Sequence, residues 1–185
     1  MKVAIFKTDL GWMGVGATAR GVAKAVLPRR SRAAVEREFA SYLRAPSFSA
    51  EGSRVATHHV EVARNEIRSY LAGRRQILDL PLDLEGQPVF RRKVWDVLRT
   101  IPYGRVRSYG WVARKIGTPR AARAVGGACG NNPTPLIVPC HRVVAGDGSL
   151  GGFSGGLPAK KRLLRLEGVL RENARPVKRR VVASK

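Results

Sequence analysis

Residues 136–143 read LIVPCHRV, a short apolar run that ends in a proline, a cysteine and a histidine. An apolar run of this length, bounded by proline on one side and by later glycines on the other, is typical of a buried strand. We therefore predict a strand over 136–138 that delivers Cys140 to its end, where a rigid scaffold meets an open pocket. Taken alone, a free cysteine is usually a small buried hydrophobic residue, so its role depends on the rest of the chain.

A glycine-rich loop follows this stretch. Six glycines surround Phe153 and Ser154 over residues 146–156, which we call the glycine loop. Because glycine lets the backbone approach a flat ligand closely, the loop is expected to hold such a ligand. A helix is predicted from about Pro158 to Glu167, and residues 171–185 are predicted to form a disordered basic tail.

Two short helices are predicted upstream of the apolar run. Ser108 is a suitable N-cap for a helix that ends at Gly117, and Thr118-Pro119 is a suitable start for a second helix towards Gly130. Two short helices joined by a tight turn are typical of the helix-turn-helix motif, which binds DNA.

The second of these helices carries small residues where base-reading side chains are expected: Ala121, Ala122, Ala124 and Gly126. Arg123 is its only long side chain near the middle. We therefore predict docking to DNA with little sequence readout and insertion of Arg123 into a groove or a base stack. An ordinary surface arginine is the alternative.

The N-terminal half predicts a small antiparallel sheet, with strands over 2–7, 12–15 and 21–27. Helices are expected from Ser31 onward and over 57–71. We place a linker at 81–87, because the stretch 74–88 contains prolines and a glycine and shows no helical period. The predicted fold is α/β (α+β) in two domains, 1–80 and 88–170.

Charge indicates the class of partner. The 185 residues include 35 Lys and Arg against 13 Asp and Glu, a net charge of +22. A polyanion such as nucleic acid explains this excess best, and a generally basic surface is the alternative. Two cysteines and three histidines without repeated Cys-x-x-Cys pairs do not predict a zinc site. With no apolar run long enough for a membrane span, we expect a soluble, cytoplasmic, reduced protein.

The motifs together resemble a known family. Four segments carry the resemblance: 123–128 (RAVGGA), 132–133 (NP), 139–143 (PCHRV) and 153–156 (FSGG). They are similar to the O6-alkylguanine-DNA alkyltransferases, also called methylated-DNA–protein-cysteine methyltransferases. The resemblance is close from about Pro88 to Gly168 and looser before it, where residues 8–12 (TDLGW) are similar to the family's opening.

The resemblance implies a ribonuclease-H-like N-terminal domain and a helix-turn-helix, winged-helix-like C-terminal domain that binds DNA from the minor groove. It implies single-turnover repair of double-stranded DNA that carries O6-alkylguanine, without cofactor or metal. O4-alkylthymine is left open as a further substrate. A monomer is expected, with cooperative binding on DNA also left open.

Residue roles are likewise implied by the resemblance. Cys140 would accept the alkyl group, His141 would act as its base through a water, and Glu167 would orient the histidine. Tyr109 would help to flip the nucleotide and protonate guanine, Arg123 would fill the vacated stack, and Asn132 would fix the turn before Cys140. The base pocket would use Val143, Phe153, Ser154 and Gly155. Some relatives have Tyr where this chain has Phe153.

The chemistry of the residues agrees with this assignment. An alkyl carbon on guanine O6 is an electrophile that a thiolate can attack, and we expect a basic neighbour to lower the pKa of the Cys140 thiol. Adjacent residues on a regular strand point to opposite faces, so a turn or a bridging water must connect Cys140 to His141. The thioether product is not hydrolysed, which predicts one turnover per molecule.

Two other functions use the same residues. A cysteine hydrolase would use Cys140, His141 and Asn132 and would turn over repeatedly. An alkyltransferase-like binding module would recognise alkylated bases without transfer, although members of that class lack the acceptor thiol that this chain has.

Overall fold

The computed structural model describes residues 1–43 and 50–170, so the expected tail at 171–185 lies outside the described residues. The chain forms two compact units. The first contains Met1–Glu85 and Pro133–Ile137, and the second contains Gly86–Asn132 and the chain from Val138 onward. The continuous ranges expected from the sequence group 133–137 with the C-terminal part. In the structure, Ala25 donates a backbone hydrogen bond to the Pro133 carbonyl at 2.8 Å, which ties this segment to the first unit.

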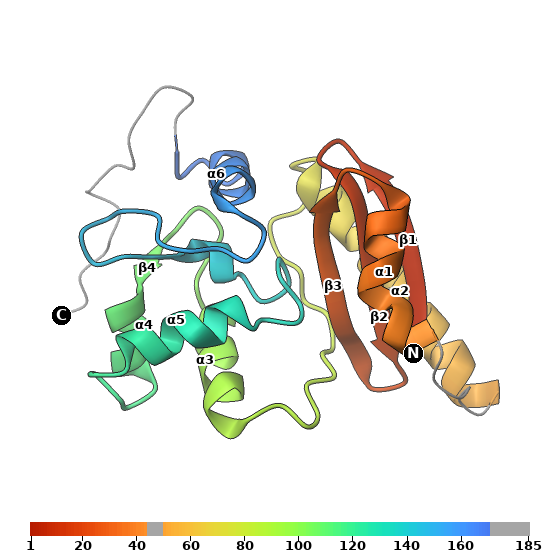
Figure 1. The fold of residues 1–185 in the computed structure, drawn as a ribbon, viewed down its shortest axis with the longest axis horizontal. Helices are drawn as coiled ribbons and strands as arrows, with labels where there is room; N and C mark the ends of the chain where they lie inside the picture. The colour runs from red at the N-terminus through yellow and green to blue at the C-terminus, as the bar shows by residue number, and fades with distance from the viewer. Residues whose placement is uncertain (44–49, 171–185) are drawn as a thin grey trace. The chain divides into compact units, whose positions relative to one another are not determined.

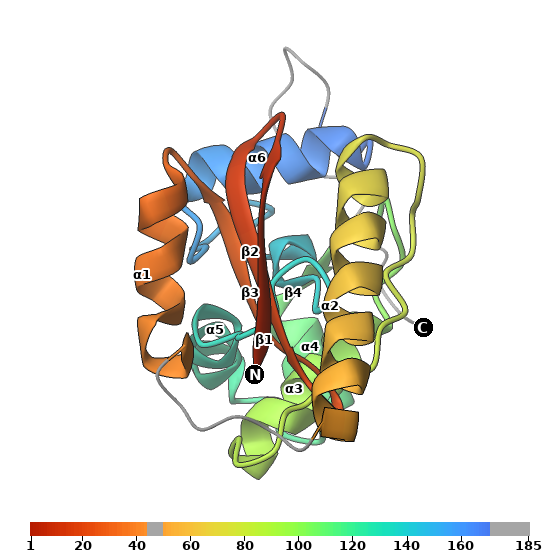
Figure 2. The same cartoon turned by 90° about the vertical axis from the view of Figure 1, so that its right-hand side faces the viewer.

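The first unit is built on an antiparallel sheet with the order β1-β2-β3. Its strands are β1 (Lys2–Thr8), β2 (Gly11–Thr18) and β3 (Gly21–Arg29), followed by α1 (Arg32–Leu43) and α2 (Ala50–Leu71). The two helices lie on opposite faces of the sheet (Figures 1 and 2). The three strands match those expected from the sequence, with each end extended by a few residues at most.

Successive residues of β2 point to opposite faces of the sheet, and this alternation explains how both faces are covered. Met13 and Val15 are fully buried on one face. Glycines occupy the other face, where a Cβ on Gly14 would lie 2.5 Å from the ring of Phe39 and 2.6 Å from Val35. Because these glycines have no side chain, α1 can pack directly on the backbone of the sheet.

Helix α2 begins at Ala50, so the predicted start at residue 57 is wrong. Gly52 and Ser53 have low helix propensity, which hides the first two turns from a reading based on sequence. Ala56 and Val60 are buried four residues apart and extend the apolar stripe back into those turns. Within residues 1–43 and 50–170, no helix is long and apolar enough to cross a membrane.

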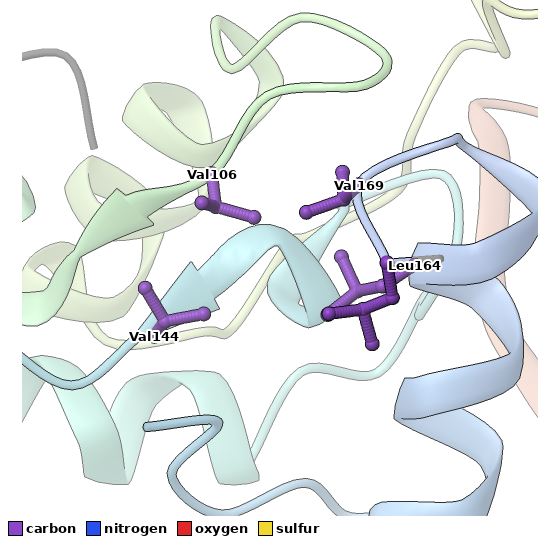
Figure 3. Close-up of a cluster of buried hydrophobic side chains, with 5 residues drawn as sticks. Val106, Val144, Leu164 and Val169 are labelled. Atoms are coloured by element: carbon purple, nitrogen blue, oxygen red, sulfur yellow. The ribbon is translucent and has the colours of Figure 1, made fainter. Parts of the chain in front are cut away.

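The second unit is mostly helical. It contains α3 (Val89–Arg99), β4 (Arg107–Ser108), α4 (Tyr109–Lys115), α5 (Ala122–Gly130), a 3₁₀ turn (Cys140–Arg142), β5 (Val143–Val144) and α6 (Leu157–Leu166). We call Cys140–Arg142 the Cys140 turn. Strands β4 and β5 pair in parallel. A buried cluster that includes Val106, Val144, Leu164 and Val169 joins both strands to α6 (Figure 3).

The predicted strand over 136–138 is wrong. Residues 136–137 form a buried turn in which Leu136 has a φ of 76°. Pro135 and Pro139 flank the run, and proline has no backbone N–H to donate to a strand ladder. Cys140 therefore lies in a 3₁₀ turn instead of at a strand end.

The two helices before this turn are present with one changed boundary. Ser108 caps α4 as expected, since its Oγ accepts from the backbone N–H of Trp111 at 3.1 Å. Helix α5 starts at Ala122, so the start expected at Thr118-Pro119 is wrong. The Ala121 N–H donates to the Thr118 carbonyl at 2.9 Å, and this turn precedes the helix.

Candidate active site

Cys140 is held by an asparagine. The thiol is buried, with 3% of the residue exposed. Asn132 Nδ2 donates to Cys140 Sγ at 3.1 Å and to the Val138 carbonyl at 2.8 Å. The Cys140 N–H donates to the same carbonyl at 2.8 Å. Asn132 therefore fixes both the sulfur and the backbone that leads into the Cys140 turn.

His141 faces a buried carboxylate. Its ring is fully buried, and Nε2 lies 2.6 Å from Oε1 of Glu167. Arg142 Nε donates to both oxygens of Glu167 at 3.0 Å, and the Gly104 N–H donates to Oε2 at 3.1 Å. A buried carboxylate needs such partners because charge is costly to bury. Glu167 is thereby fixed in position against the imidazole.

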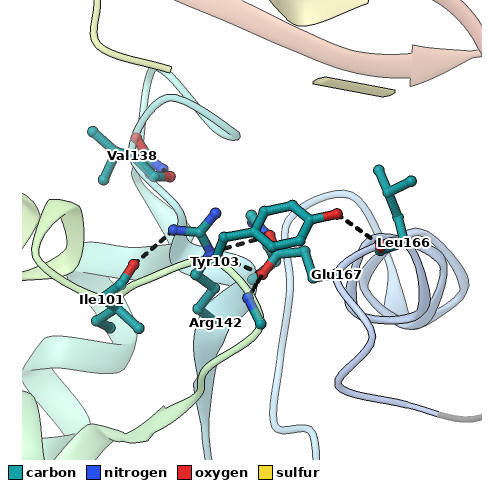
Figure 4. A network of polar contacts seen from close by, with 9 residues as sticks. Ile101, Tyr103, Val138, Arg142, Leu166 and Glu167 are labelled. Carbon is teal, nitrogen blue, oxygen red and sulfur yellow. Dashed lines mark hydrogen bonds and ion pairs between the residues drawn. The ribbon is translucent and has the colours of Figure 1, made fainter. Parts of the chain in front are cut away.

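Arg142 is itself held by the segment after α3 (Figure 4). Its Nη1 donates to the Ile101 carbonyl at 2.6 Å, and its guanidinium carbon lies 5.8 Å from the centre of the Tyr103 ring. The Tyr103 hydroxyl donates to the Leu166 carbonyl at 2.7 Å. This network joins the Cys140 turn, the 101–104 segment and the end of α6 around Glu167.

Burial sets the protonation states of the pair. It raises the pKa of the Cys140 thiol, opposed by the hydrogen bond from Asn132 and by the charge of Lys160. Burial also lowers the pKa of His141, opposed by Glu167. The resting site thus holds a protonated thiol beside a neutral imidazole. The expectation that a basic neighbour lowers the thiol pKa is wrong for this resting state, because desolvation outweighs it.

A cavity of about 390 Å³ opens on Cys140, within the range of about 300–1,000 Å³ typical of ligand sites. Three segments line it, namely the start of α4, the exposed side of α5 and the glycine loop. The other lining residues are Tyr109, Ala122, Arg123, Gly126, Cys129, Gly130, Gly152, Phe153 and Ser154.

Tyr109 is the first residue of α4, and its side chain lies against the glycine loop. Its hydroxyl donates to the Gly152 carbonyl at 3.4 Å. Burial raises the pKa of Tyr109 to about 12, so the hydroxyl remains a proton donor at neutral pH. Gly151 has a φ of 64°, and a Cβ there would lie 3.0 Å from the Tyr109 ring. Glycine at 151 therefore lets the loop close over the tyrosine.

Known proteins are similar to this chain in sequence and in fold. Residues 89–169 match the model of the 6-O-methylguanine DNA methyltransferase, DNA binding domain. The chain is similar to the OGT protein of Mycobacterium tuberculosis, whose crystal structure is in complex with DNA. The two are 34% identical, with a TM-score of 0.70, over 89% of this chain and 91% of that one. The chain belongs to the O6-methylguanine-DNA methyltransferase family.

Other members of the family are also similar to this chain. The O6-methylguanine-DNA methyltransferase of Pyrococcus kodakaraensis is 30% identical, with a TM-score of 0.60, over 91% of this chain and all of that one. A methylated-DNA–protein-cysteine methyltransferase of Mycolicibacterium paratuberculosis is 51% identical over 105 residues. That match covers 57% of this chain and 63% of the relative.

The structure places most of the residues singled out from the sequence in or next to this cavity. Cys140 is paired with Asn132, and the next residue, His141, is paired with Glu167. Four others lie outside the cavity lining. Ala121 precedes α5, Ala124 is exposed, Gly155 lies beyond the lining part of the loop, and Val143 is fully buried.

Several residues of the site were not predicted from the sequence. Arg142 lies within the PCHRV motif, but the motif alone gave it no role. Its partner Glu167 lies 25 residues further along the chain. Cys129 belongs to none of the motifs, yet it lines the same cavity as Cys140. Lys160 resembled its solvated basic neighbours on α6. In the described residues, no group of three or more His, Cys, Asp or Glu could hold a metal ion.

Proposed function

We propose that this protein repairs double-stranded DNA by moving the alkyl group of O6-alkylguanine to Cys140, once per molecule. The observation that carries the proposal is a buried thiol, Cys140, that Asn132 holds beside a cavity lined by Arg123 and Tyr109. The residue after the thiol, His141, is paired with Glu167. Family membership supports the same reaction.

The proposed reaction uses the resting protonation states. With Nε2 directed at Glu167, His141 takes the thiol proton through Nδ1 and a water. The sulfur attacks the alkyl carbon, the carbon–O6 bond breaks, and its electron pair goes to guanine. Tyr109 donates a proton to guanine, and the proton lost by the thiol balances this gain. The thioether persists, because the bond between sulfur and an unactivated alkyl carbon is not hydrolysed by water.

Access to O6 requires the nucleotide to leave the duplex, at a cost of a few kcal/mol. We infer that α4 and α5 act as a helix-turn-helix within a winged-helix-like domain over 88–170. The small residues at the start of α5 and just before it, Ala121, Ala122, Ala124 and Gly126, would then approach the minor groove. Arg123 would fill the vacated stack. Arg123 is exposed on α5 and lines the cavity mouth, which supports this role.

The flipped base would be recognised by the backbone of Val143 and by the loop residues 153–155. We further infer that the unit with β1–β3 is ribonuclease-H-like, since its antiparallel sheet is covered by a helix on each face. We propose a monomer in the cytoplasm, where thiols stay reduced. A binding isotherm with duplex DNA measures whether several molecules bind cooperatively along the duplex.

Intact-protein mass spectrometry tests the function. After incubation with duplex DNA that carries O6-methylguanine, the protein should gain one methylene, located on the Cys140 peptide. The amount of repaired guanine should equal, and never exceed, the amount of protein. Repair beyond one equivalent would favour a hydrolase. Tight binding of the damaged duplex without any mass gain would favour an alkyltransferase-like binding module.

Replacing Arg123 with alanine should slow methyl transfer from duplex DNA by roughly 10- to 100-fold, because the vacated stack is left unfilled. Transfer from the free O6-benzylguanine base should change little. Single-turnover rates with both substrates measure the difference. Arg120→Ala is the matched control, since it removes one exposed cation just before α5. Equal losses with duplex and free base would contradict the role of Arg123.

A further inference from the structure

A lysine is buried next to the acceptor cysteine. Lys160 on α6 has 0% of its surface exposed, which is rare for a lysine because its charge must be desolvated. Its Nζ donates to the backbone carbonyls of Val143 at 2.6 Å, of Leu150, and of Gly152 at 3.3 Å. An ammonium has three donors, so these three carbonyls satisfy it fully.

The three carbonyls come from two different parts of the site. Val143 follows the Cys140 turn directly, whereas Leu150 and Gly152 belong to the loop that lines the cavity. The Gly152 carbonyl also accepts from the Tyr109 hydroxyl. One ammonium group therefore fastens the cavity wall to the segment that carries the thiol.

The charge of Lys160 also acts on the thiol. The titratable groups that face it are Cys140, Cys129 and His141. Lys160 opposes the rise in the pKa of both thiols, and burial lowers the pKa of Lys160 to about 8. A hydrophobic side chain of similar length could fill the same space without this desolvation cost, so the retained charge needs a purpose.

We propose that Lys160 is a positioning residue for alkyl transfer, which holds the glycine loop against the Cys140 segment and stabilises the thiolate as it forms. This proposal rests on the proposed function. Lys160 is then a second cation of the site, in addition to Arg142, which is paired with Glu167.

Three variants separate charge from packing. Lys160→Met removes the charge and nearly keeps the length, Lys160→Arg keeps the charge, and Lys161→Met changes an exposed neighbour on the same helix. The first assay is alkylation of Cys140 by iodoacetamide across pH, followed by peptide mass spectrometry. Cys129 is followed in the same spectra as a second readout, because Lys160 also opposes the rise in its pKa.

In Lys160→Met we expect the midpoint of the Cys140 profile to move up by about one pH unit, with reaction at neutral pH about tenfold slower. Lys160→Arg and Lys161→Met should keep the midpoint of the natural protein. The second assay is methyl transfer from damaged duplex. It should also slow at least tenfold in Lys160→Met, while affinity for undamaged duplex stays within twofold.

An unchanged midpoint in Lys160→Met would overturn the proposal, as would a shift in Lys160→Arg equal to that in Lys160→Met. If Lys160→Met does not fold, Lys160→Gln carries the comparison, since its amide can still donate to the carbonyls without charge. A natural protein that reacts with iodoacetamide but takes no methyl group from DNA would refute the proposed function alone. The iodoacetamide comparison would still decide the role of Lys160.

Discussion

Replacing Cys140 with serine abolishes methyl transfer, by roughly 10⁴-fold or more, while the affinity for duplex DNA is unchanged. A serine hydroxyl ionises far less readily than a thiol, and its oxygen is a much poorer nucleophile towards an alkyl carbon. The hydroxyl can still accept the hydrogen bond that Asn132 gives to Sγ, so the turn should keep its shape. Intact-protein mass spectrometry and a duplex-binding isotherm measure the two effects.

Cys129→Ser is the matched control for this experiment. It removes the second thiol that lines the same cavity, and transfer should remain within a few-fold of the natural rate. A full mass gain in Cys140→Ser, or its loss in Cys129→Ser, would show that Cys129 is the acceptor and that the proposed mechanism is wrong.

Replacing Glu167 with glutamine should harm both stability and transfer. The neutral amide leaves Arg142 without its buried carboxylate, and breaking a buried ion pair on one side costs about 3–5 kcal/mol. It also removes the negative charge that stabilises the protonated imidazole of His141, so transfer should fall by roughly 10²–10⁴-fold, the contribution expected of general base catalysis. Urea denaturation measures the free energy of unfolding, and single-turnover assays at a temperature where the variant is folded measure the rate.

Glu85→Gln is the control for charge removal. Glu85 pairs with Arg20 in the first unit, where the side chains are 69% and 63% exposed. Exposed pairs contribute about 0–1 kcal/mol, so both stability and transfer should be close to those of the natural protein. A Glu167→Gln variant as stable as Glu85→Gln would mean that Arg142 finds another acceptor and that the buried network is not needed for folding.

Local signals in the sequence predicted local structure well. Ser108 caps α4 because the cap and the N–H that it accepts from lie three residues apart. Residues 136–138 were misassigned because an apolar run between prolines fits a buried turn as well as a strand. The positive φ of Leu136 leaves no mark in the sequence, since glycine does not occupy the position.

Long-range contacts could not be found from local patterns. The pairing of Glu167 with His141 spans 26 residues and came only from the resemblance to a family. Lys160 looked like Lys161, because both lie on a basic amphipathic helix. What separates them is the return of the glycine loop over Lys160, and that return depends on how the whole unit folds.

The short segment 133–137 has a consequence for how this protein can be divided. The chain passes between the two units at 85–86, again at 132–133, and back at 137–138, just before Cys140. Cleavage of the linker therefore gives a C-terminal fragment that still carries one segment of the first unit. A fragment that starts at residue 86 would carry residues 133–137 without Ala25, their hydrogen-bond partner in β3. The C-terminal half thus includes a segment that packs with the first unit, although the single linker in the sequence suggests a clean division.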